Sequence, residues 1–302
     1  MRLPLCFLFC GILLWFLWDA AAIRSAVTEA LLLCATSVIP AMFPFLVVSN
    51  LLIMLGLGDL LSPAFAAVMS HLFRLPGAAG SALLLGLTGG YPIGAKTAAD
   101  LYRSGRLTRE ETQRLLTFCN NANPAFFLSV LGAGVFHSVR VGLYLWLIHL
   151  LSALLSGWFL CRNRTGSSRI QCPPIKNANS DPFSVLWVSA VGSALQGILS
   201  ICAFVVIFYV LTRPLASLPG LWGSAATGIL ELFSLMPRLS NDSANLILVS
   251  ALSGWGGLSV LCQTASMLAG TGLSISSCIK GKLLQGLFSA LFAALLILFR
   301  IV

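Results

Sequence analysis

Two stretches of sequence decide the fold, LTGGYPIGAK at residues 87–96 and LSGWGGLS at residues 252–259. Each is a polar, glycine-rich break inside a run of apolar residues. In lipid, backbone N–H and C=O groups must be paired within the protein, so irregular backbone survives only where protein buries it or where it lines a cavity. Two such breaks at corresponding positions in two halves of a chain indicate a solute-binding site near the membrane midplane.

The composition is that of a membrane protein with many helical spans. Of the 302 residues, 58% are hydrophobic and 9% are charged, and the mean hydropathy is +0.95. Apolar runs of about twenty residues, enough to cross a bilayer as a helix, recur along the chain. They lie at 5–22, 27–56, 60–74, 76–99, 115–136, 140–160, 184–211, 218–237, 243–270 and 280–300. We therefore predict an all-α, polytopic membrane helix bundle with inverted repeats and broken or re-entrant helices.

The distribution of charge indicates the topology. The chain carries 18 basic and 9 acidic residues, and the two most basic segments, 100–114 and 161–181, flank apolar runs. The positive-inside rule places both segments in the cytoplasm. Both termini are then cytoplasmic, and the two glycine-rich breaks have opposite orientations, as in an inverted repeat. A nucleic-acid partner is not expected, because it would need a basic face on a soluble module.

We expect four regions along the chain. An N-terminal transmembrane helix occupies 1–26, a first repeat with an extra helix occupies 27–160, a basic cytoplasmic linker occupies 161–182, and a second, inverted repeat occupies 183–302. Pro40 and Pro44 are expected to break the long apolar run of the first repeat. The first helix also has features of a cleavable signal peptide, although its length favours an uncleaved helix.

The cysteines and histidines form no motif for metal binding or redox chemistry. The nine cysteines include no CxxC pair and have the positions of small buried apolar residues. A disulfide between Cys161 and Cys172 would require an oxidising compartment, whereas the charge pattern places their loop in the cytoplasm. The sequence also has no nucleophile elbow, P-loop or HExxH helix. We expect no cofactor, no metal and no enzymatic activity.

The first break offers both backbone groups and a cation. Its three glycines and the Tyr91-Pro92 pair leave backbone groups without helical partners, which can bind a ligand or can mark a kink where helices pack closely. Lys96 lies one turn further on. It either neutralises an anionic solute, pairs with Asp100 at i, i+4 spacing or extends to the interface.

Three further segments carry candidate polar groups. Asn120, Asn121 and Asn123 can contact a polar solute or cap the helix that follows them. Glu231 lies in an apolar run and is a candidate for proton or cation coupling. Asp242 is a second coupling candidate or a surface helix cap. The candidate substrate-binding residues are Thr88, Gly89, Gly90, Tyr91, Pro92, Gly94, Lys96, Asn120, Asn121, Asn123, Ser253, Gly254, Trp255, Gly256, Gly257, Ser259 and Gln263.

Several of these motifs resemble those of a known family. The sequence GYPIGAK at 90–96, Cys119-Asn120, and GWGGLSV at 254–260 with Gln263 are similar to the signatures of YlbJ-type sporulation integral membrane proteins, in the nucleoside-recognition or Gate-domain group. The resemblance covers residues 27–300. It implies inverted repeats like those of concentrative nucleoside transporters and, for the sporulation members, movement of dipicolinate across the outer forespore membrane of a bacterium.

The resemblance also implies a binding chemistry. Dipicolinate is a flat pyridine dianion, and Lys96, the amides of 120–123, helix N-termini and an aromatic ring such as Tyr91 or Trp255 suit it. A nucleoside or another small metabolite, and a non-transporting Gate-domain scaffold, are the alternatives. The expected partners are the lipid bilayer and a small solute, with a homo-oligomer or other membrane proteins as further partners.

Overall fold

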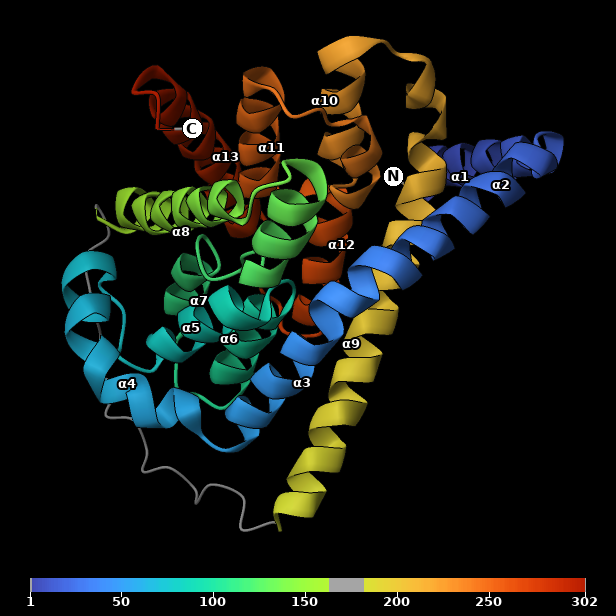
Figure 1. The fold of residues 1–302 in the computed structure, drawn as a ribbon. Coiled ribbons are helices and arrows are strands. Elements are labelled where there is room, and N and C mark those ends of the chain that lie inside the picture. Colours follow the sequence, from blue (N-terminus) through green and yellow to red (C-terminus); the bar gives the residue numbers. More distant parts are fainter. Residues whose placement is uncertain (1, 163–181, 302) are drawn as a thin grey trace.

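The protein is a bundle of helices (Figure 1). The computed structural model describes residues 2–162 and 182–301, and no strand occurs in these ranges. Within them, five helices are long and apolar enough to cross a membrane: Ala20–Leu52, Val139–Cys161, Phe183–Leu215, Ser243–Leu268 and Ser276–Leu298. Shorter apolar helices include Ala79–Gly89 and Phe126–Val135. The prediction of a polytopic helical membrane bundle is confirmed. The linker and Cys172 lie largely or wholly outside the described residues.

The first half of the chain begins with α1 and one long helix. The elements are α1 (Arg2–Trp18), α2 (Ala20–Leu33), the π-helical turn η1 (Cys34–Val38), α3 (Ile39–Met54), α4 (Leu57–Val68), η2 (Met69–Phe73), α5 (Ala79–Gly89), α6 (Ile93–Arg103), α7 (Arg109–Leu115), η3 (Phe126–Val135) and α8 (Val139–Cys161). The helix after α1 thus begins at Ala20 rather than near residue 27. Thr108 and Glu111 form the capping box of α7 that their spacing predicts.

The second half begins with another long helix. Its elements are α9 (Phe183–Thr212), the short 3₁₀ turn η4 (Arg213–Ser217), α10 (Gly220–Leu230), the 3₁₀ turn η5 (Phe233–Arg238), α11 (Ser243–Trp255), α12 (Gly257–Leu268) and α13 (Ser276–Leu298). The predicted break at residues 254–257 separates α11 from α12. Gly256 provides it, because its left-handed φ of 87° ends one helix and begins the next.

The prediction that prolines break the first long run is wrong. Pro44 lies inside α3, and Ala20–Leu52 forms one continuous helical span. The π-helical turn Cys34–Val38 ends two residues before Pro40. Such turns relax the hydrogen-bond ladder by one residue, so the helix continues past proline residues that lack an N–H donor.

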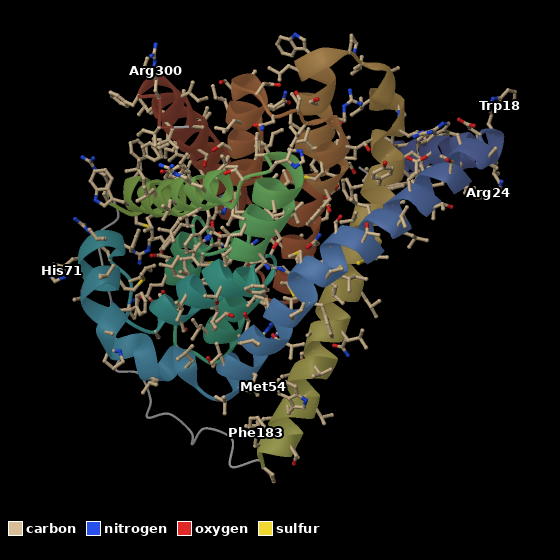
Figure 2. The ribbon with its side chains drawn as sticks, viewed as in Figure 1. Trp18, Arg24, Met54, His71, Phe183 and Arg300 are labelled. Carbon is tan, nitrogen blue, oxygen red and sulfur yellow. The ribbon has the colours of Figure 1, made fainter. Side chains whose placement is uncertain are left out.

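The two long helices α2–α3 and α9 run antiparallel along each other. Near one end Glu29 Oε2 accepts a hydrogen bond from the Tyr209 hydroxyl at 3.2 Å, and near the other Asn50 Nδ2 donates to the carbonyl of Ala190 at 3.4 Å. Met54 and Phe183 accordingly lie at the same end of the pair (Figure 2). Residue numbers therefore increase along one helix in the direction in which they decrease along the other.

Each half also contains a short helical hairpin. In the first half α5 turns back as α6, because Gly86 and Gly94 come so close that a Cβ on Gly86 would lie 3.0 Å from the Cα of Gly94. In the second half α10 turns back as η5, and Arg238 Nη2 donates to the carbonyl of Leu218 at 2.7 Å. The residues at the two turns are Gly90–Pro92 and Glu231–Leu232.

Apart from α4 and η2, which are extra elements of the first half, the described elements follow the same order in both halves. A 33-residue span is followed by a hairpin, then by an interrupted helix, and finally by a 23-residue span, either Val139–Cys161 or Ser276–Leu298. By this order, residues 254–257 correspond to 119–125, between α7 and η3, rather than to residues 89–90. Helices are interrupted at both predicted breaks, but the two breaks do not occupy corresponding positions in the two halves. The first is a hairpin turn, because α5 and α6 fold back on each other, whereas α11 and α12 do not.

Candidate functional site

Both hairpin turns and both interrupted helices meet around one cavity. It has a volume of about 30 Å³ and is bordered by Tyr91, Asn123, Glu231 and Gln263. Apolar side chains of α3, η3, α9 and η5 complete the wall, and these belong to the largest buried apolar cluster of the described residues. Residues 91 and 263, more than 170 positions apart in the sequence, therefore border the same cavity.

Glycines at the turns allow the segments around the cavity to approach one another closely. Gly90 has a φ of +84°, and a Cβ added to it would lie 3.0 Å from the Cβ of Asn123. Gly256 has a φ of +87°, and its added Cβ would lie 3.2 Å from the Tyr91 hydroxyl. Only glycine adopts this backbone region without strain and also leaves room for the opposing segment. The glycines thus bring the four segments together.

Buried amides at the cavity have polar atoms without partners. Asn123 Oδ1 accepts a hydrogen bond from Phe126 N at 2.9 Å, as a helix cap does, while its Nδ2 has no partner among the described residues. Gln263 Nε2 contacts Ser259 Oγ at 3.5 Å, and its Oε1 likewise has none. A buried amide atom without a hydrogen bond costs about 1–3 kcal/mol. These atoms are available to a polar ligand.

The other predicted asparagines connect the site to its neighbours. Asn120 Nδ2 donates to Thr264 Oγ1 of α12 at 2.8 Å, which joins the interrupted helix of the first half to that of the second. Asn120 Oδ1 is buried without a partner in the described part of the chain. Asn121 Oδ1 accepts from Gln285 Nε2 of α13 at 3.0 Å. Both side chains are fully buried.

Glu231 forms the turn of the second hairpin. It is 2% exposed and borders the cavity, and its Oε2 accepts a hydrogen bond from the backbone N–H of Ser234. The carboxylate therefore caps η5 in the way that acidic side chains cap helix N-termini. No basic side chain of the described residues forms an ion pair with it. Gly257 packs close to it, because a Cβ there would lie 3.5 Å from the Glu231 Cα.

A buried lysine that the sequence analysis did not select lies beside Tyr91. Lys282 of α13 is 2% exposed. Its Nζ donates to the Tyr91 hydroxyl at 3.2 Å and to Gln285 Oε1 at 2.9 Å, and it lies 4.8 Å from the centre of the Tyr91 ring. The Tyr91 hydroxyl in turn donates to the carbonyl of Ser253 at 3.2 Å. Tyr91 thus joins the first hairpin to α11 and α13.

The hydrogen-bond network continues from Lys282 to α8. Gln285 Nε2 lies 3.3 Å from His149 Nε2 and donates to the carbonyl of His149 at 3.2 Å. His149 Nε2 also accepts from the backbone N–H of Ala122 at 3.3 Å. Because the 23-residue spans of both halves contribute to one network, the irregular segment 119–125 is fixed from two sides.

Lys96 lies apart from this network. Its side chain is 63% exposed and pairs with Asp100 at 3.3 Å, the i, i+4 alternative of the sequence analysis. Thr88 is also exposed, and its hydroxyl donates to the carbonyl of Leu84 within α5. Neither residue borders the central cavity. Lys96 instead borders a separate pocket of about 320 Å³ with Asn50 and Thr97.

The remaining candidates of the second half have structural contacts. Ser253 is fully buried, and its hydroxyl has no partner among the described residues. Gly254 packs against Gly286 of α13, where a Cβ would lie 2.7 Å from the Gly286 Cα. Trp255 Nε1 donates to the carbonyl of Ile229 at 3.0 Å, which fastens α11 to the second hairpin. In the first half, Pro92 follows Tyr91 through a cis peptide bond.

Asp242 is an exposed helix cap. Its Oδ1 accepts from the backbone N–H of Asn245 at 2.9 Å, and its Oδ2 accepts from the Ser240 hydroxyl. The hydrogen bond from Ser240, followed by those from Asn245, lowers the pKa of Asp242 to about 2. A carboxyl group with this pKa holds no proton near neutral pH. The local contacts therefore fit the capping alternative.

Two larger pockets lie on either side of the central cavity along α2–α3. One, of about 460 Å³, borders Thr36, Ser37 and Met236, the last of these in η5. The other is the Lys96 pocket, which borders Asn50 of α3 beside the first hairpin. Met42, between these positions, borders the central cavity itself. The three spaces thus follow one another along a single helix.

The sequence contained a signal that Lys282 is a functional candidate. An ionisable residue within an apolar span is a functional candidate by default, and Gln285 follows it at helical spacing. Lys280 and Lys282 together, at the start of the run 280–300, have the pattern of interfacial lysines that extend toward water. Only the packing of α13 against α8 and α11, together with its contact to Tyr91, shows that one of the pair is buried.

Comparisons with known proteins agree with the motif resemblance. Residues 35–139 match a family model, Gate, described as nucleoside recognition. The chain is 29% identical over 304 residues to the sporulation integral membrane protein YlbJ of Bacillus subtilis (strain 168), an alignment that covers 86% of this chain and 74% of the relative. No solved structure matches the chain. The resemblance to YlbJ-type membrane proteins with a Gate domain is confirmed.

Proposed function

We propose that this relative of YlbJ-type sporulation integral membrane proteins transports a small polar or anionic solute across a bacterial membrane. The observation that carries the proposal is the convergence of two hairpin turns and two interrupted helices on one cavity with unpartnered amide atoms. Irregular backbone at membrane depth is tolerated where it lines such a space. A scaffold that only held partner proteins would have no use for buried, unsatisfied polar atoms.

The positions of the central cavity and the two larger pockets support movement of a solute through the protein rather than binding alone. The central cavity of about 30 Å³ has room for about one or two water molecules, which is less than any aromatic or nucleoside solute needs. A pocket of about 460 Å³ borders η5 at Met236, and one of about 320 Å³ borders α6. Displacement of one hairpin at a time would open the cavity to one pocket and then to the other, as alternating access requires.

The repeat architecture supports the same proposal. Antiparallel long helices and a common order of elements fit two inverted repeats, in which each hairpin closes the cavity from its own side. We propose residues 27–160 and 183–302 as these repeats, with both termini and the basic linker in the cytoplasm. Labelling of single cysteines at the termini with a membrane-impermeant thiol reagent tests the orientation, and labelling from outside in intact cells would contradict it.

We propose dipicolinate as the first solute to test and a nucleoside as the second. The relative is named a sporulation protein, and the matching family model is described as nucleoside recognition. In the sporulation case the membrane would be the outer forespore membrane. Amide donors and acceptors at Asn123 and Gln263 suit the polar edge of either ring.

Glu231 is the proposed coupling residue. It is the buried acid at a hairpin turn, so a change in its charge would act directly on the segment that has to move. Asp242, the second candidate, is exposed and accepts hydrogen bonds from Ser240 and Asn245, so it is the control residue in experiments on coupling.

Uptake into proteoliposomes tests the function. Purified full-length protein should accumulate labelled dipicolinate or uridine faster than liposomes without protein. Gln263→Leu, which removes the unpartnered amide from the cavity, should reduce that uptake, whereas Gln196→Leu at an exposed site of α9 should not. Folded wild-type protein that moves neither solute, in either direction and at any pH tested, would overturn the proposal.

A further inference from the structure

Lys282 is a buried amine with no counter-ion among the described residues. Its side chain is 2% exposed, and no described carboxylate forms an ion pair with it. The Tyr91 hydroxyl and Gln285 Oε1 accept its hydrogen bonds, and both are neutral groups. A buried ammonium that lacks an opposite charge is expensive, and within a membrane span such a residue is usually kept for function.

The position of Lys282 connects it to the solute cavity. Tyr91 is the residue that both borders the cavity and contacts Lys282 Nζ, through its hydroxyl at 3.2 Å and its ring at 4.8 Å. Tyr91 therefore links the buried amine to the wall of the cavity. Tyr91 lies on the hairpin turn that has to move if the cavity is to open.

The acceptors around Lys282 can be replaced by a carboxylate. An ammonium group has three N–H donors, and the two side-chain acceptors at 3.2 and 2.9 Å leave one without a side-chain partner. A carboxylate oxygen forms a shorter and stronger charge-assisted hydrogen bond than a phenol does. It would also supply the missing negative charge, and the two buried charges would stabilise each other.

We propose that Lys282 is the carboxylate-binding residue of the transport site, with the Tyr91 hydroxyl holding its amine until a solute carboxylate takes that place. The proposal rests on the function proposed above and narrows its substrate class to carboxylates. Lys96 does not take this role, because its exposed ammonium already pairs with Asp100. The amides of Asn123 and Gln263, which border the cavity, then contact the rest of the solute.

The test compares three probes with the full-length protein in nanodiscs. They are pyridine-2,6-dicarboxylate, its neutral isostere pyridine-2,6-dicarboxamide, and uridine, each titrated by calorimetry. Wild-type protein should bind the dicarboxylate at least about tenfold more tightly than the dicarboxamide, since a hydrogen bond to a charged group is worth that much. Equal affinity for the two would overturn the proposal without any variant being needed.

Two lysine variants on the same helix provide the matched comparison. Lys282→Gln should weaken dicarboxylate binding at least about tenfold and leave dicarboxamide binding within about twofold. Lys280→Gln, which changes an exposed lysine two residues away, should leave both affinities unchanged. If Lys282→Gln weakens all three probes equally, or none of them, Lys282 has a structural role and the inference is wrong.

The outcomes separate this inference from the proposed function. Wild-type protein that binds and moves uridine or the dicarboxamide, without preference for the dicarboxylate, overturns the role of Lys282 and leaves transport standing. Wild-type protein that binds and moves none of the probes overturns both. Should Lys282→Gln fail to fold, equal wild-type affinities for dicarboxylate and dicarboxamide would still overturn the inference.

Discussion

Lys282 of α13 and Tyr91 of the α5–α6 turn are joined by a hydrogen bond of 3.2 Å and by a cation–π contact of 4.8 Å. The contact fastens the 23-residue span that ends the second half to the hairpin of the first. It also places a cationic side chain against the wall of the central cavity. The charge of the site and the position of the hairpin thus depend on the same pair of residues.

The Tyr91 hydroxyl should stabilise the fold measurably. Tyr91→Phe removes the acceptor for Lys282 and the donor to the Ser253 carbonyl, so we expect a loss of about 1–3 kcal/mol. Tyr102→Phe is the control, because the Tyr102 hydroxyl has no hydrogen bond in the described part of the chain. Thermal unfolding in detergent measures both variants. Equal melting temperatures would show that the hydroxyl contributes nothing to stability.

Gly90 should be more sensitive to alanine than another glycine with a similarly positive φ. Gly90 and Gly270 have φ values of 84° and 73°, but only Gly90 has neighbours within 4 Å of an added Cβ. Gly270→Ala should cost about 1–2 kcal/mol for the left-handed backbone alone, and Gly90→Ala should cost more and impair solute uptake. Similar losses in the two variants would mean that the approach to Asn123 has no energetic importance.

Glu231 should determine proton dependence. With Glu231→Gln, uptake driven by a pH gradient should fall to the level without a gradient, whereas exchange of labelled for unlabelled solute should persist, because exchange needs no net proton movement. Asp242→Asn should retain gradient-driven uptake, since Asp242 is an exposed cap. Gradient-driven uptake that survives in Glu231→Gln would remove Glu231 from coupling.

Lys96 should have little influence on binding or stability. Its pair with Asp100 is exposed, and exposed ion pairs contribute about 0–1 kcal/mol. Lys96→Ala should therefore leave the melting temperature and the Kd for dipicolinate close to those of wild type. A change in uptake rate that disappears at high salt would fit its position at the pocket beside α6. A Kd raised tenfold or more would instead place Lys96 at the bound solute.

Part of the site could be predicted from local sequence alone. Buried amides, glycines and a tyrosine in apolar runs are expensive in lipid wherever the chain places them, so Asn123, Gln263 and Tyr91 were identified without a structure. The local pattern could not distinguish Lys96 from Lys282, because both lie near the end of an apolar run and the burial of each depends on the neighbouring helix.

By itself, the sequence determined that the chain forms membrane helices and where those helices are interrupted, since hydropathy and glycine or proline breaks act over one or two turns. Only the tertiary structure decided that residues 87–96 form a hairpin turn, that residues 254–257 correspond to 119–125, and that Glu231 forms the second turn. It also decided that Lys282 is the cation beside the site. These outcomes depend on contacts between Tyr91, Asn123 and α13, which form only when glycines allow distant backbones to pack closely.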